Sequence, residues 1–188
     1  AYFYYNRVNF MSDIDTGLNR DVFRVAQWAA GRIGRTAMRA VIRHPNMELV
    51  GLHVHSADKV GQDAGELCGL SPVGITATAS IDDLIQTRPD CVLYMPEGYD
   101  IEAMEKLLNA GINIVTTRSE FFYPPGMAPE LRQRIETACQ NGSATLFATG
   151  SSPGFSTVVL PLALSYMSRQ IDCITIDEFA NIPASTTP

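Results

Sequence analysis

An α/β fold, a doubly wound parallel sheet of the Rossmann type, is predicted by the alternation of short apolar runs with helical patterns between residues 22 and 148. Two further observations favour it. The first strand runs into a glycine-containing turn that opens a helix. Loops rich in Gly, Pro, Ser and Thr follow the other strands, at the sheet edge where ligands of such folds bind.

The expected strands are short and rich in apolar residues. They fall at residues 22–29, 48–55, 74–78 (the weakest), 91–95, 112–116 and 144–148. The first helix is expected to end near His44-Pro45 and to bury one face, made of Ile33, Ala37, Ala40 and Val41.

Capping residues mark the later helices. Ser80 with Asp83 three residues on forms a capping-box pattern for a helix that stops before Pro89. Asp100 is the expected N-cap of the next helix, which ends at Gly111. Pro129 suits the first turn of a helix that runs to Asn141-Gly142.

After Gly154 the alternation stops. An apolar run at 155–168 is expected to form a buried helix, and residues 171–182 are strand-like. We therefore expect three parts: a poorly ordered leader (1–20), a nucleotide-binding Rossmann domain (21–150), and the truncated start of an α+β substrate domain (151–188).

Composition argues against several kinds of partner. The net charge is −6, from 14 basic and 20 acidic residues, and no stripe of Lys and Arg exists to follow a nucleic-acid backbone. The longest apolar run is too short to span a bilayer. The four cysteines are far apart and lack neighbouring histidines, so we expect no metal site, reduced thiols and a cytoplasmic location.

The turn after the first strand carries the clearest functional signal. A strict G-x-G-x-x-G motif would have glycine at Ala29, and the other two glycines are Gly31 and Gly34. Such turns bring backbone N–H groups and a helix N-terminus to a dinucleotide pyrophosphate. An ordinary strand-to-helix turn is the alternative. Arg32, inside the turn, is a better phosphate donor than Arg35.

No acidic residue ends the second strand, where a protein that binds NAD usually holds the ribose hydroxyls. His55 and Ser56, with Lys59 nearby, would instead bind the extra phosphate of NADP. The alternative is that His55 is simply a polar strand end. The expected cofactor is therefore NADP or NAD, with NADP slightly preferred.

Two later loops are further candidates. Thr116 and Thr117 follow a buried strand, and residues 149–155 (TGSSPGF) form a loop that can seat a nicotinamide ring or serve as a hinge. No nucleophilic Ser-His-Asp or Cys-His-Asp arrangement is visible, and no catalytic acid or base is identified. At most one of Asp177 and Glu178 can face a substrate, because adjacent strand residues point to opposite faces.

Several segments together resemble the dihydrodipicolinate reductase family and the related 2,4-diaminopentanoate dehydrogenase-like amine oxidoreductases. They are WAAGRIGR (28–35), VGQDAGELCGL (60–70), MPEG (95–98), VTTR (115–118) and ATGSSPGF (148–155). The DAGEL-type loop is the most specific of them. Trp28, where dihydrodipicolinate reductases carry glycine, is more similar to the diaminopentanoate branch.

The resemblance implies an NAD(P)H-dependent oxidoreductase that transfers hydride to or from a C=N or C–N carbon of an amino acid or diamine. It also implies a homo-oligomer formed through the second domain, where the family's catalytic segment lies. The cofactor contacts it implies are Gly31, Arg32, Ile33 and Gly34 at the pyrophosphate, and Met95, Pro96, Thr116, Thr117 and Ser151 to Pro153 at the ribose and nicotinamide. A nucleotide-binding or regulatory module without catalysis is the alternative function.

Overall fold

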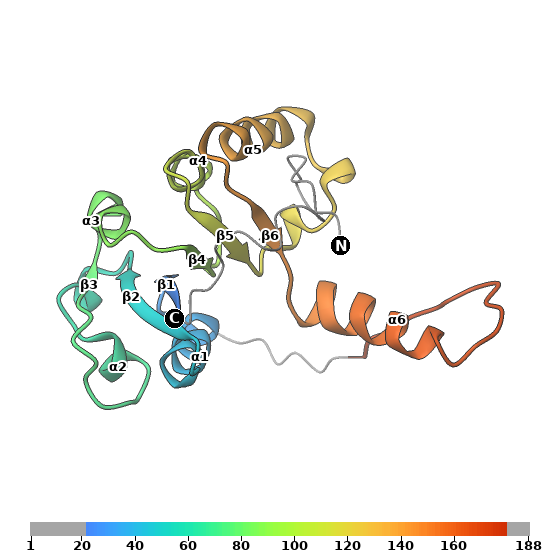
Figure 1. Cartoon of the computed structure of the whole chain (residues 1–188), viewed down its shortest axis with the longest axis horizontal. Helices are drawn as coiled ribbons and strands as arrows, with labels where there is room; N and C mark the ends of the chain where they lie inside the picture. Colours follow the sequence, from blue (N-terminus) through green and yellow to red (C-terminus); the bar gives the residue numbers. More distant parts are fainter. Residues whose placement is uncertain (1–21, 180–188) are drawn as a thin grey trace.

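The computed structural model describes residues 22–179, in which six parallel strands form one sheet (Figure 1). Their order is β3-β2-β1-β4-β5-β6, which places the first strand at the centre and reverses the winding between β1 and β4. The predicted fold class is confirmed. The strands are β1 (Phe23–Trp28), β2 (Met47–His53), β3 (Ala77–Thr78), β4 (Cys91–Tyr94), β5 (Asn113–Thr116) and β6 (Leu146–Ala148).

Three of the helices, α3, α4 and α5, begin at the predicted residues Ser80, Asp100 and Pro129. They are α1 (Arg32–Arg43), α2 (Ala64–Leu67), α3 (Ile81–Gln86), α4 (Ile101–Asn109), α5 (Pro129–Gly142) and α6 (Leu160–Ser165). Ser80 Oγ accepts the N–H of Asp83 at 3.1 Å, and Asp100 Oδ1 accepts the N–H groups of Glu102 and Ala103. The predicted leader, 1–20, lies outside the described residues.

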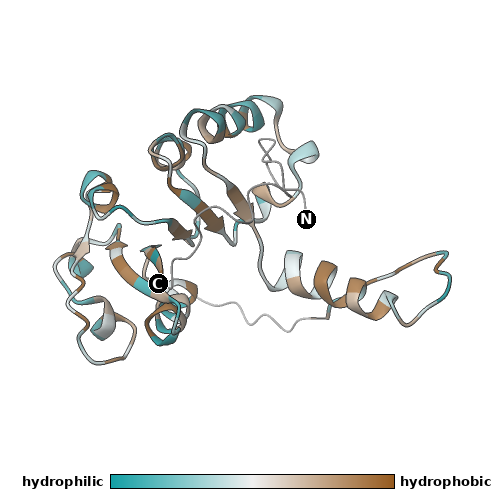
Figure 2. Ribbon diagram, viewed as in Figure 1, coloured by the Kyte–Doolittle hydropathy of each residue, from teal (hydrophilic) through white to brown (hydrophobic). Residues whose placement is uncertain are grey.

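Alternate residues of the central strands point to opposite faces of the sheet, so each strand contributes side chains to two hydrophobic cores. Val92 and its neighbours pack with α3, α4 and α5 on one face, whereas Val25 and its neighbours pack with α1 and α2 on the other. Figure 2 shows the strands as the most hydrophobic layer between these helices. Both faces are therefore covered, as a parallel sheet requires.

The buried face of α1 differs from the predicted one, in which Val41 alone was assigned correctly. The helix buries Gly34, Met38 and Val41, whereas Ile33 is 54% exposed and Ala40 is exposed. The cause is close contact between the helix and the end of β1, where a Cβ on Gly34 would overlap the carbonyl oxygen of Ala29. That contact fixes the rotation of the helix and turns Ile33 outward.

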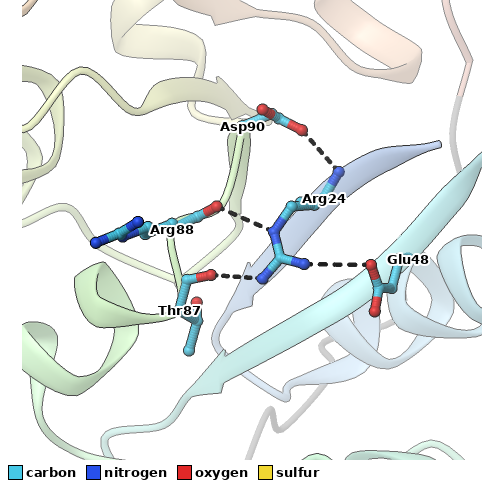
Figure 3. A network of polar contacts seen from close by, with 5 residues as sticks. All are labelled: Arg24, Glu48, Thr87, Arg88 and Asp90. Carbon is cyan, nitrogen blue, oxygen red and sulfur yellow. Dashed lines mark hydrogen bonds and ion pairs between the residues drawn. The ribbon is translucent and has the colours of Figure 1, made fainter. Parts of the chain in front are cut away.

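At the opposite, amino-terminal edge of the sheet, Arg24 joins three segments of the chain (Figure 3). Its guanidinium donates to the carbonyl oxygens of Thr87 (2.7 Å) and Arg88 (3.2 Å) and reaches Glu48 at 3.4 Å. Its backbone N–H donates to Asp90 Oδ2 at 2.9 Å. The side chain thereby fixes the loop that precedes β4.

We expect Arg24→Met to lower the free energy of unfolding by about 1–2 kcal/mol, because two carbonyl oxygens lose their donors while the aliphatic packing remains. Urea denaturation followed by circular dichroism measures the change. Glu48→Gln is the matched control, and its effect should stay within about 0.5 kcal/mol because this ion pair is exposed. Equal effects of the two changes would contradict this assignment.

The segment after β6 does not follow the predictions for burial and strand formation. The stretch Ser151–Val159, whose backbone is not helical from Ser152 to Gly154, continues into α6, and this segment extends away from the sheet (Figure 1). It is not a buried helix, since Phe155 and Leu162 are more than half exposed. Residues 171–179 form no strand, because no neighbouring strand of the described chain offers them hydrogen bonds. Residues 180–182 of that prediction lie outside the described residues.

No helix within residues 22–179 is long and apolar enough to cross a membrane. The same residues contain no group of three or more His, Cys, Asp or Glu side chains arranged to hold a metal ion.

Candidate functional site

The turn between β1 and α1 has the backbone geometry of a glycine turn even where glycine is replaced. Ala29 has φ +74°, a left-handed conformation that costs an L-residue about 1–2 kcal/mol. The buried side chain of Gln27 stabilises this turn: its Nε2 donates to the carbonyl oxygens of Trp28 (2.9 Å) and Ala29 (3.1 Å). Ala29 therefore adopts the left-handed backbone conformation that favours glycine at this position of the turn.

The two glycines that remain have different roles. Gly34 is required by the protein itself, because α1 lies directly on the carbonyl group of Ala29. Gly31 has φ −76° and nothing within 4 Å of the position that a Cβ would occupy. Neither its backbone nor its packing requires glycine. The space beside Gly31 is thus open on the side where a ligand would approach the helix N-terminus.

The N-terminus of α1 is suited to an anion. Gly31 is its N-cap, no side chain caps it, and its first turn contains no acidic residue. The positive end of the helix dipole is therefore not neutralised by the protein. Arg32 and Ile33 are exposed there, whereas Arg35 Nε donates to the carbonyl oxygen of Ala30 at 3.0 Å and so braces the turn.

A cavity of about 500 Å³ lies between the carboxyl ends of β1 and β2 and the start of α4. Its walls combine rings, small apolar side chains and charged groups. They are formed by Trp28, His53, Val54, His55, Ala79, Ile81, Asp100, Glu102, Ala103 and Lys106. Ser56 is exposed directly after His55 and precedes a short helical turn (Ala57–Lys59).

Aromatic rings from three neighbouring strands contact one another, and two of them, Trp28 and His53, line this cavity. The buried indole of Trp28 stacks on the ring of His53, with ring centroids 3.7 Å apart. The centroid of the Tyr94 ring lies 5.3 Å from that of Trp28. Burial, with a contribution from nearby His55, lowers the pKa of His53 to about 4, so His53 is neutral. Trp28, His53 and Tyr94 were not predicted as site residues, although each is an aromatic residue at the carboxyl end of a strand.

Arg118 connects two loops that the sequence assigned to the nicotinamide half of a cofactor. The guanidinium of Arg118 donates to the carbonyl oxygen of Glu97 and pairs with Glu120, and the backbone N–H of Arg118 donates to Thr116 Oγ1 at 3.1 Å. Thr116 is fully buried, and Thr117 beside it is exposed. Arg118, the last residue of the VTTR segment, was not predicted as a site residue.

The remaining predicted contacts surround the same edge. Met95 donates its N–H to the carbonyl oxygen of Trp28 at 3.2 Å, and Pro96 beside it is half-buried. After β6, Ser151 is exposed and Pro153 half-buried. The loops after β1, β4, β5 and β6 therefore lie at one edge of the sheet. The cofactor roles of these residues stay predictions.

The DAGEL-type loop owes its shape to a single carboxylate. Asp63 accepts the N–H groups of Gly65 (2.7 Å), Val73 (3.0 Å) and Gly74 (2.8 Å). Desolvation opposes ionisation of Asp63, but these backbone donors hold its pKa below the usual value. The carboxylate of Asp63 thus stabilises the conformation of the DAGEL-type loop.

The strand order, the strained turn and the uncapped helix define a Rossmann-type domain. A family model described as "Dihydrodipicolinate reductase, N-terminus" matches residues 28–148. The chain belongs to this family.

Two relatives are amine dehydrogenases. That of Streptomyces virginiae is 37% identical over 159 residues, which are 80% of this chain and 44% of that protein. The solved amine dehydrogenase of Mycobacterium smegmatis superposes with a TM-score of 0.70 at 26% identity, covering 80% of this chain and 45% of that one. The chain thus spans less than half the length of these two relatives.

A third relative shares the fold. The WlbA dehydrogenase of Chromobacterium violaceum, solved in complex with NADH and a UDP-sugar, gives a TM-score of 0.59 at 20% identity. It covers 80% of this chain and 41% of that one.

Proposed function

We propose that this chain is the nucleotide-binding part of an NAD(P)H-dependent oxidoreductase acting on a C=N or C–N carbon of an amino acid or diamine. The observation that carries the proposal is the turn at Gly31. The chain leaves open space at an uncapped helix N-terminus, in a family whose members are named reductases and amine dehydrogenases.

The residues present fit a dinucleotide. The N-terminus of α1 and Arg32 would hold the pyrophosphate, and the cavity beside His55 would take the adenosine half. The loops joined by Arg118 would face the nicotinamide half. The cofactor, when bound, supplies the hydride chemistry, whereas these residues bind and orient it.

Fluorescence titration with NADPH and NADH tests the proposal. We expect saturable binding of at least one, and an affinity about tenfold weaker in Arg32→Ala if that guanidinium holds phosphate. Arg39→Ala, an exposed arginine further along α1, is the control and should bind normally. Failure of both cofactors to bind would refute the proposal, and an unchanged affinity of Arg32→Ala would refute that contact.

The substrate and the assembly belong to the same proposal. Residues from 151 onward would begin the substrate domain, through which the protein would form homo-oligomers. The exposed apolar side chains of Phe155, Val159 and Leu162 support further packing there. Turnover of amines or imines by the native protein tests the activity. Cofactor binding without turnover of any amine would favour a regulatory module instead.

A further inference from the structure

The loop that follows β4, residues 95–99 (the β4 loop), is held at its middle by a single side chain. At its end, the ring of Tyr99 packs edge-on against Phe121, with ring centroids 5.1 Å apart. Glu97, at the middle of the loop, is exposed. Among the hydrogen bonds of the described chain, only the one from the Arg118 guanidinium to the carbonyl oxygen of Glu97 holds this residue. The conformation of the loop therefore depends on Arg118.

Arg118 is itself fixed by the loop that follows β5, residues 117–121 (the β5 loop). Strands β4 and β5 pair with Tyr94 opposite Thr116, so the two loops begin side by side. The backbone N–H of Arg118 donates to Thr116 Oγ1 at 3.1 Å, and the guanidinium pairs with Glu120. Both ends of the arginine are thus attached to the β5 loop while its guanidinium reaches across to the β4 loop.

The partners of the Arg118 guanidinium indicate that it acts on the β4 loop rather than on a ligand. Its two terminal nitrogens contact Glu97 and Glu120, and its Nε is buried with no hydrogen-bond partner in the described part of the chain. The side chain is 25% exposed, against 45% for Lys106 in its ion pair with Asp82. Solvent therefore screens the contacts of Arg118 less than those of Lys106.

We propose that Arg118 is a positioning residue that keeps the β4 loop ordered for the nicotinamide riboside, and thereby gives this domain a preference for a complete dinucleotide over ADP. The inference rests on the proposed function, in which the β4 and β5 loops face the nicotinamide half. A loop that is already ordered loses less conformational entropy when a ligand binds. Without the guanidinium, the carbonyl group of Glu97 loses its donor, and the cofactor has to order the loop.

The test compares the dissociation constant of the reduced cofactor with that of its adenosine diphosphate half, which is ADP for NADH and 2′-phospho-ADP for NADPH. Both ligands carry the adenosine and the pyrophosphate, but only the cofactor carries the nicotinamide riboside. We expect Arg118→Met to weaken binding of the cofactor at least about tenfold, the usual loss for a hydrogen bond to a charged group. Binding of the half should weaken by no more than about twofold, because its contacts lie outside the two loops. Isothermal titration calorimetry measures both constants.

Two further variants control this test. Arg118→Lys keeps the positive charge and the aliphatic stem but lacks the planar fork that contacts Glu97 and Glu120 together, so its loss should be smaller than that of Arg118→Met. Arg134→Met removes an arginine of α5 that pairs with Glu105 of α4, outside the two loops, and should bind both ligands normally. An equal loss of both ligands in Arg118→Met would show a general structural effect and overturn the inference. So would an unchanged affinity for the cofactor.

A measurement without cofactor separates this inference from the proposed function. The NMR order parameter of the Gly98 backbone N–H reports how firmly the middle of the β4 loop is held. We expect it to fall in Arg118→Met and to stay unchanged in Arg134→Met, and an unchanged value in Arg118→Met would overturn the inference. If neither cofactor binds the unaltered protein while Gly98 responds, the proposed function is refuted and the contact of Arg118 with this loop stands.

Discussion

Gly34→Ala should destabilise the protein by about 3 kcal/mol and greatly weaken dinucleotide binding. A Cβ at this position overlaps the carbonyl carbon and oxygen of Ala29, which are backbone atoms and cannot move aside as a side-chain end can. Helix α1 must therefore shift away from β1, at a cost typical of severe overpacking. Urea denaturation and NADPH titration measure the two effects.

Gly31→Ala provides the contrast three residues earlier. Its φ of −76° suits alanine and its surroundings are open, so the free energy of unfolding should fall by only about 0.5–1 kcal/mol, the cost of placing alanine instead of glycine at an N-cap. Dinucleotide binding should still fall, because the new methyl group would occupy the open space that we propose for the pyrophosphate. A stable Gly34→Ala protein, or normal binding by Gly31→Ala, would contradict the roles assigned to the two glycines.

Gln27→Glu should lower the free energy of unfolding by about 3 kcal/mol at pH 7. The side chain is fully buried, and its Nε2 faces two carbonyl oxygens that a carboxylate would repel. Gln27→Met is the control of similar size. It loses the two hydrogen bonds without adding a charge, and about 1–2 kcal/mol is expected.

The effect of Gln27→Glu should depend on pH. Burial raises the pKa of the new carboxyl above its unfolded value of about 4.3, so below that pH both states are protonated and the charge penalty is absent. The penalty grows as pH rises from there to the pKa of the folded state, and is constant above it. Thermal unfolding between about pH 4 and pH 8 tests this, and a pH-independent difference from Gln27→Met would contradict it.

The fold was largely predictable because its local signals agree. Strand runs, the caps Ser80 and Asp100, and Pro129 at the start of α5 each mark an element that forms where expected. The errors occur where tertiary contacts decide. Gly34 sets the rotation of α1, and the run at 171–179 shows that apolar composition cannot make a strand without a hydrogen-bonding neighbour.

The site was predictable by its position and less so by its residues. Loops after parallel strands meet at one edge, so the glycine turn predicted the edge at which the structure brings these loops together, and the cofactor roles of their residues stay predictions. The indole of Trp28 and the ring of His53 contact each other only because β1 pairs with β2, in the register Trp28 with His53. Arg118 likewise reaches Glu97 through the pairing of β4 with β5. The registers in which these strands pair cannot be read from a single sequence.

The central position of β1 also has a consequence for how the chain folds. Each described strand pair is parallel, so no two neighbours are joined by a tight hairpin, and Ala26 of β1 pairs with Val92 of β4. Long loops must close before these contacts can form, which slows folding relative to helical bundles of similar size. During synthesis on a ribosome, β1 would emerge before the other described strands, and its edge toward β4 would stay unpaired until the segment containing β4 had been synthesised.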